Sequence, residues 1–70
     1  MDQIKIGRFI AAMRKEQGLT QRQLAEILDV SNRTISKWEC GDGLPDLSNV
    51  LPLCDALGIT ADELLRGRRA

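Results

Sequence analysis

The chain has 70 residues and carries ten basic and ten acidic side chains, so its formal net charge is zero. A domain of this length buries only about 60% of the surface that its unfolded chain exposes, which leaves no room for an enclosed substrate chamber. We therefore do not expect an enzyme. Histidine is absent, and the two cysteines, Cys40 and Cys54, fall short of the four soft ligands of a structural zinc site, so we expect neither a metal nor a cofactor.

The N-terminal segment lacks the features of a signal peptide, because Asp2, Lys5 and Arg8 interrupt any apolar stretch there. The longest hydrophobic run, Phe9 to Met13, is far shorter than the roughly 20 residues of a membrane-spanning helix, so we expect no membrane segment. These observations predict a cytoplasmic protein whose thiols stay reduced.

Charge is unevenly distributed along the chain. Residues 1–41 carry seven basic and five acidic side chains, residues 42–65 carry five acidic and no basic ones, and the tail adds Arg66, Arg68 and Arg69. The zero net charge by itself argues against a polyanionic partner, since nucleic-acid-binding proteins usually carry a basic surplus. The distribution instead predicts that any anion-binding face lies within residues 1–41 or in the tail.

The spacing of apolar residues predicts two helices in the first part of the chain. The first begins near Asp2 and ends at Gly18, and its apolar residues recur at i, i+3, i+4 and i+7. The second opens at Thr20, which stands three residues before Gln23 as in a capping box, and ends at Asp29. The residues expected to be buried in these two helices are Ile6, Phe9, Ile10, Met13, Leu24, Ala25, Ile27 and Leu28.

A third helix follows after a tight turn. Asp29 occupies the turn, and aspartate adopts the left-handed conformation more readily than most residues, although less easily than glycine. Ser31 is the expected N-cap of a helix that runs through Cys40 and stops at Gly41, with Ile35 and Trp38 facing inward.

Two further helices are predicted after the loop DGLPDLSN. The fourth has an apolar face that ends at Gly58, and because Pro52 removes a backbone hydrogen bond we expect it to begin late, near residues 49–51, or to bend there. The fifth is short, starts with the capping pair Thr60 and Glu63, and closes at Gly67. Their apolar residues are Val50, Leu53, Cys54, Leu57, Leu64 and Leu65.

The sequence therefore predicts an all-α fold, a compact bundle of five helices in one domain spanning residues 1–70. Residues 21–40 carry a helix-turn-helix, because two short helices joined by a tight turn cross steeply and need a small residue such as Ala25 at the crossing. The residues expected on the outer face of the second of these helices are Ser31, Asn32, Arg33, Ser36 and Lys37. Such a donor-rich face suits the major groove of DNA, where asparagine pairs with adenine and arginine with guanine.

The chain resembles the lambda-repressor-like helix-turn-helix family, the class of phage repressors, Cro proteins and xenobiotic-response-element regulators. The resemblance extends from about Ile6 to Leu65 and lies in the phrases IGRFIAAMRKEQGLTQRQLAEIL, VSNRTISKWECG, LPDLSNVLPLCDALGIT and DELL. It implies a sequence-specific DNA-binding transcriptional regulator whose helix 31–40 reads the major groove of double-stranded DNA.

The resemblance also implies roles for individual residues. Asn32, Arg33 and Lys37 stand at the positions of base readers, with Ser31 and Ser36 able to touch base or backbone. The expected phosphate contacts come from Gln21 with its neighbours Thr20 and Arg22, helped by the backbone amides of that helix start, and from the backbone amide of Cys40.

Other residues are expected to be structural. In the family, the residues matching Arg14 and Glu39 form an ion pair between the first helix and the end of the third, and Arg14 could also share a nearby phosphate. Trp38 is expected in the core rather than as a stacking platform for a base, because it lies three residues from Ile35 on the inner stripe. The chain departs from the family pattern at Asp29, where glycine is usual, and at Cys40, where an amide-bearing or basic residue is common. Asp42 and Asp46 add negative charge near the expected DNA backbone, so we expect modest, salt-sensitive binding.

One recognition helix covers few base pairs, so we expect two copies on a pseudo-palindromic operator, as a weak homodimer or a dimer that forms on DNA. Leu44, Leu47 and Leu51 are candidates for the self-complementary patch. A C-terminal effector or dimerisation domain is possible in a longer natural chain. The competing hypothesis is a protein-interaction module, such as an antitoxin or adaptor on the same scaffold, which the acidic second half favours.

Overall fold

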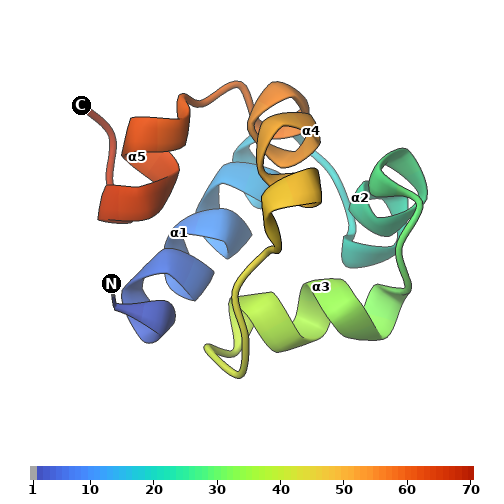
Figure 1. The fold of residues 1–70 in the computed structure, drawn as a ribbon. Coiled ribbons are helices and arrows are strands. Elements are labelled where there is room, and N and C mark those ends of the chain that lie inside the picture. The colour runs from blue at the N-terminus through green and yellow to red at the C-terminus, as the bar shows by residue number, and fades with distance from the viewer. Residues whose placement is uncertain (1) are drawn as a thin grey trace.

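The computed structural model describes residues 2–70, and all of the regular structure in that range is helical (Figure 1). The all-α, five-helix prediction is confirmed. The helices are α1 (Gln3–Glu16), α2 (Gln21–Leu28), α3 (Asn32–Glu39), α4 (Leu47–Leu57) and α5 (Ala61–Arg66). None of them is long and apolar enough to cross a membrane.

Short polar side chains start the helices where the sequence predicts. The carboxylate of Asp2 accepts the Lys5 amide at 3.1 Å at the start of α1. Capping boxes open α2 and α5, because Thr20 and Gln23 exchange two hydrogen bonds, as do Thr60 and Glu63. These starts are fixed by contacts three residues apart, so they follow from local sequence.

Asp29 ends α2 in the left-handed conformation, with φ of 56°. It is the one residue other than glycine with positive φ within residues 2–70. The next amide, of Val30, donates to the carbonyl of Ala25 at 3.0 Å and closes the turn into α3. The tight turn predicted at Asp29 is therefore present without the glycine that is usual there.

The predicted late start of α4 is wrong, because the helix begins at Leu47 with Pro52 inside it. Pro52 removes only one hydrogen bond, the one to the carbonyl of Ser48, which belongs to an exposed residue. Asp46 holds the first turn: its carbonyl accepts the Asn49 amide at 2.9 Å, and its carboxylate accepts the Asn49 side-chain amide at 2.7 Å. Those contacts form the turn despite the proline.

All five helices contribute to one hydrophobic core, and Figure 1 shows α1 running between α5 and the α2–α3 pair. Trp38 and Cys54 are buried, as predicted. Ile27 is not, since 57% of its surface is exposed. The buried residues Leu24, Leu28 and Ala25 span roughly 100° around α2, and Ile27 lies about 60° beyond Leu24 on the side away from Ala25, outside the buried face. The most deeply buried side chains are Ile10, Leu24, Ile35, Leu53, Leu57 and Leu64.

Candidate nucleic-acid interface

The α2–α3 unit is built around a buried crossing of two eight-residue helices. Ala25 is 3% exposed, and its neighbour Leu24 on α2 and Ile35 on α3 are fully buried. Because only small or fully buried side chains separate α2 from α3, the two helices pack closely and their outer faces lie next to each other in solvent. The start of α2 and the outer face of α3 are therefore available together.

Three predicted base readers form an exposed group on the outer face of α3. Asn32, Arg33 and Lys37 are exposed, and within residues 2–70 none of their side chains makes an intramolecular hydrogen bond or ion pair. Arg33 and Lys37 are four residues apart, so they lie on the same side of the helix. The structure thus leaves the donors of this face free for an external ligand.

The two serines of this face differ from that group. The Ser31 hydroxyl oxygen accepts the Thr34 amide at 3.1 Å and lies 2.9 Å from the Thr34 hydroxyl, so Ser31 works as the N-cap of α3. Ser36 is half-buried. Neither has the reach or the freedom of the longer side chains beside it, and their contribution to base reading stays a prediction.

The start of α2 offers unpaired backbone donors. Within this turn the Gln23 amide is bonded to the Thr20 hydroxyl oxygen and the Leu24 amide to the Thr20 carbonyl, which leaves the amides of Gln21 and Arg22 without intrahelical acceptors. The side chain of Arg22 is exposed beside them. An anion placed here would meet two N–H groups and the positive end of the helix dipole.

Gln21 has a second role that the sequence did not indicate. Its side-chain amide nitrogen donates to Oε1 of Glu39 at 3.0 Å, across the gap between α2 and α3. An amide nitrogen carries two hydrogens, so one remains for a phosphate while the other fixes the side chain. Glu39 thus orients the residue expected to meet the DNA backbone.

The expected phosphate contact of Cys40 is weakened by the structure. Its thiol is exposed, but its backbone amide donates to the carbonyl of Ser36 at 3.0 Å. This hydrogen bond already occupies the group that we expected to meet a phosphate. The neighbouring acidic residues Asp42 and Asp46 are exposed beyond it.

Arg14 and Glu39, the residues for which we expect a structural bridge, form a bidentate pair. Nε and Nη2 of Arg14 donate to the two carboxylate oxygens of Glu39 at 2.6 and 2.9 Å, and Nη1 donates to the carbonyl of Leu19 at 2.8 Å. Their side chains are 10% and 7% exposed. The hydrogen bonds that Arg14 donates to Glu39 raise the pKa of Arg14, although burial lowers it, so Arg14 keeps its positive charge.

Gly7 was not singled out from the sequence, yet it determines how closely α1 approaches α3. A Cβ atom at this position would overlap the carbonyl oxygen of Trp38 and lie 2.9 Å from that of Glu39. A glycine inside a helix lowers helix propensity, so its presence there was the available signal. Gly7 lets the two backbones touch at the end of α3, next to the Arg14–Glu39 pair.

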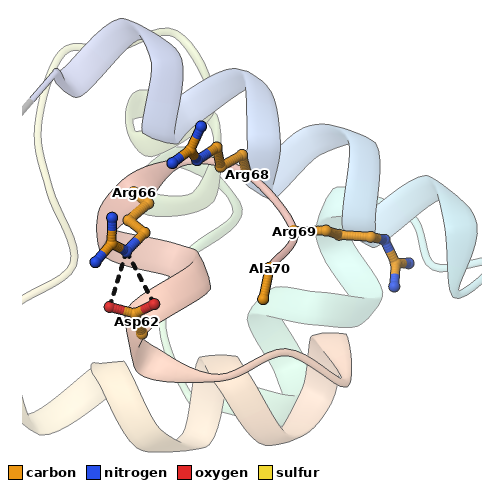
Figure 2. A pocket seen from close by; sticks show the side chains of 5 residues that line it. All are labelled: Asp62, Arg66, Arg68, Arg69 and Ala70. Carbon is orange, nitrogen blue, oxygen red and sulfur yellow. Dashed lines mark hydrogen bonds and ion pairs between the residues drawn. The ribbon is translucent and has the colours of Figure 1, made fainter.

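The tail arginines lie in a separate place, around a shallow depression of about 380 Å³ beside α5 (Figure 2). Arg66 pairs with Asp62 at 2.9 Å, and Arg69 pairs with Glu16 of α1. The other carboxylate in this region, Glu63, accepts the Ala70 amide at 2.9 Å, and that bond and the one from Thr60 lower the pKa of Glu63. Carboxylates thus neutralise much of the basic tail, and α5 packs on α1 and α4 rather than on α3.

Within residues 2–70 no group of three or more potential metal ligands comes together.

The chain matches known proteins over most of its length. The helix-turn-helix family model matches residues 10–64. The HTH-type transcriptional activator BcrR of Enterococcus faecalis is 46% identical over 79% of this chain and 27% of its own length. The phage CTXphi transcriptional repressor RstR of Vibrio cholerae is 39% identical over 87% of this chain and 54% of its own length. The chain thus spans about half or less of these two curated relatives.

A solved structure agrees in both fold and sequence. The P22 c2 repressor, crystallised with a synthetic operator, superimposes with a TM-score of 0.85 and is 39% identical, covering 89% of this chain and 94% of that one. The chain therefore belongs to the lambda-repressor-like helix-turn-helix family.

Proposed function

We propose that this protein is a sequence-specific DNA-binding transcriptional regulator that reads the major groove with α3. The observation that carries the proposal is the unpaired donor group Asn32, Arg33 and Lys37 on the outer face of a helix whose inner side is fully packed. The names of the relatives support it, since they include a transcriptional activator, a repressor and a repressor bound to an operator. The proposal includes a cytoplasmic location and no enzymatic activity.

In this proposal the start of α2 holds the DNA backbone while α3 meets the bases. Gln21 offers one side-chain N–H, and the amides of Gln21 and Arg22 add two more donors. Such contacts position a protein on DNA without reading its sequence. The exposed carboxylates of Asp42 and Asp46 lie in the loop and cap between α3 and α4, and they reduce affinity by repelling phosphates, so binding is modest and salt-sensitive.

Two copies act together on a pseudo-palindromic operator. Leu47 and Leu51 are 91% and 68% exposed and stand one turn apart on α4, so they form an apolar stripe suited to a second copy. Leu44 was expected in the same patch, but it is half-buried against the core and contributes less. Two leucines bury far less than the ~1,200 Å² of a stable complex, so pairing is weak without DNA.

Selection from random or chromosomal DNA fragments tests the proposal. The domain is expected to enrich a two-fold symmetric motif with half-sites about one helical turn apart. A Gln21→Ala variant should bind selected and random DNA less tightly by the same factor, because it loses a backbone contact. Failure to enrich any motif would contradict sequence-specific binding.

Assembly is tested by sedimentation and by titration. At micromolar concentration the free protein should sediment near the 7.8 kDa of one chain, and it should bind cooperatively to a full site but not to a half-site. Leu51→Ser should lower cooperativity on the full site without changing half-site affinity. A tight dimer in the absence of DNA would contradict the weak-pairing part of the proposal.

A protein-interaction module, such as an antitoxin or adaptor, is the second candidate. The zero net charge and the exposed stripe of Leu47 and Leu51 favour it, because both suit a protein partner better than a polyanion. The two candidates differ in salt dependence. DNA affinity should fall steeply with salt, whereas docking through leucines should not.

A further inference from the structure

The two cationic side chains on the outer face of α3, Arg33 and Lys37, offer only hydrogen-bond donors. Arg33 has five N–H donors and Lys37 three, and neither side chain can accept a hydrogen bond. The one carboxylate of α3, Glu39, has both oxygens occupied by Arg14 and Gln21. No acidic acceptor of α3 is therefore free for the amino group of a cytosine.

The cations also lie at a spacing that fits neighbouring base pairs. Arg33 and Lys37 are four residues apart on α3, which places them roughly 6 Å apart along the helix axis. Base pairs stack about 3.4 Å apart, so this separation corresponds to at most two base-pair steps. Asn32 precedes Arg33 in the first turn of the helix and adds a side chain with both a donor and an acceptor.

Guanine is the base whose major-groove edge best matches these groups. It presents two adjacent acceptors, N7 and O6, which fit the fork of an arginine or the single ammonium of a lysine. Adenine offers one acceptor and one donor, which matches the amide of Asn32. Thymine offers a single acceptor beside a methyl group, so it leaves most of the donors of Arg33 unpaired.

We propose that each operator half-site presents two guanines, no more than two steps apart, to Arg33 and Lys37, with an adenine next to the guanine of Arg33 in reach of Asn32. This inference rests on the proposed function. It adds the identity of the bases, which follows from the free donors of α3 and from the occupied carboxylate of Glu39.

The main competing arrangement uses the same cations for phosphates. A phosphate contact would strengthen binding to every sequence, whereas a guanine contact depends on the N7 and O6 atoms of one base. Replacing guanine by 7-deazaguanine removes N7 and leaves Watson–Crick pairing intact. This substitution therefore separates the two arrangements.

The test uses the best site selected with the wild-type protein, synthesised with 7-deazaguanine at one position at a time. We expect two positions in each half-site at which the replacement lowers affinity roughly 5- to 30-fold, within the range of a guanine contact. For Lys37→Gln, 7-deazaguanine should no longer lower affinity at one of these two positions but should still lower it at the other. For Arg33→Gln, the two positions should exchange roles. Arg8→Gln is the matched control, because it removes one charge from an exposed side chain of α1 and should keep both sensitivities.

The outcomes distinguish this inference from the function on which it rests. A selected two-fold motif without the two guanines, or guanines whose 7-deaza replacement has no effect, would overturn the inference and leave the DNA-binding function intact. Sensitivities that neither Lys37→Gln nor Arg33→Gln changes would also overturn it. A library that yields no motif would overturn both. Melting curves identical to wild type show that the exposed variants are folded.

Discussion

The inner and outer faces of α3 differ in every physical respect although they belong to the same eight residues. Ile35 and Trp38 are buried, and the carboxylate of Glu39 is fully hydrogen-bonded. Arg33 and Lys37 on the other side, and Asn32 in the first turn, are exposed and make no intramolecular side-chain hydrogen bond or ion pair within the described chain. The comparison suggests that the inner face determines the fold and the outer face determines recognition. Substitutions on each face test whether stability and DNA binding are separated in this way.

The largest loss of stability is expected from breaking the buried ion pair between Arg14 and Glu39. Arg14→Met or Glu39→Gln leaves a partner buried without its counter-charge, which costs about 3–5 kcal/mol when a nine-tenths buried pair is broken. Denaturant unfolding at low temperature measures the loss. Asp62→Asn is the control, because the Arg66–Asp62 pair is more than half exposed and contributes at most about 1 kcal/mol.

The double variant Arg14→Met/Glu39→Gln should be more stable than the sum of the two single losses implies, because no unpaired charge remains. Small and simply additive losses would mean that the pair does not hold α1 to α3.

A second inner-face effect comes from the close approach at Gly7. Gly7→Ala places a methyl group on the carbonyls of Trp38 and Glu39, which forces the helices apart and costs about 1–3 kcal/mol. Thermal unfolding of Gly7→Ala and Gly43→Ala compares the two sites, since a Cβ at Gly43 meets nothing within 4 Å. Equal melting temperatures would show that α1 does not depend on this contact.

The outer face should respond in the opposite way, with binding affected and stability unchanged. Asn32→Ala is expected to weaken binding to the best site by roughly 1–3 kcal/mol and to relax the preference at one base pair. Its melting temperature should equal that of the wild type, because the side chain is exposed. Titrations on the selected site and on random DNA check this, and equal losses on both would remove Asn32 from the readers.

At Asp29, in the turn between α2 and α3, replacement by glycine should stabilise the fold and replacement by alanine should destabilise it. Asp29→Gly relieves a non-glycine residue at φ of 56°, so we expect stabilisation by roughly 0.5–1 kcal/mol. Asp29→Ala should destabilise, because alanine has no side-chain oxygen to favour the left-handed conformation. Calorimetry of both variants measures the sign, and DNA affinity should stay constant if the turn only connects the helices.

The smallest effect is expected far from α3, at Glu63. Hydrogen bonds from Ala70 and Thr60 lower the pKa of Glu63, so its ionised form ties the tail and the start of α5 together. This tie is fully present above pH 4.5, the ordinary value, and is lost as the pH falls through the lowered pKa. Amide chemical shifts of Ala70 and Thr60 during an acid titration report it, and in Glu63→Gln they should not follow this transition.

Sequence-based prediction was correct where one recognisable local pattern decides a feature, and wrong where local signals compete. The capping pair Thr20 and Gln23 lies three residues apart, so the start of α2 could be read from the sequence. The start of α4 was misplaced because the effect of Pro52 was judged without Asp46, whose contacts hold the first turn. Ile27 was misassigned because a short helix gives too few repeats to separate neighbouring faces.

The candidate site was partly predictable for the same reason. Arg33 and Lys37 are exposed as expected, because helix periodicity places them opposite Ile35, and Asn32 is exposed in the first turn of the helix. The bond between Gln21 and Glu39 links positions on different helices, and the overlap at Gly7 depends on how two backbones pack. Neither follows from periodicity, because both require the three-dimensional arrangement.

Within residues 2–70, the side chains of Arg33 and Lys37 make no hydrogen bond or ion pair, which has a consequence for how such proteins diversify. If Arg33 and Lys37 read bases as proposed, a substitution at either one would change the preferred DNA without disturbing the buried packing, because both side chains are exposed. Duplicated copies of this gene could therefore drift to new operators through a few surface changes, each tolerated by an unaltered scaffold. The same freedom makes these positions the natural place to randomise when an altered-specificity variant is wanted.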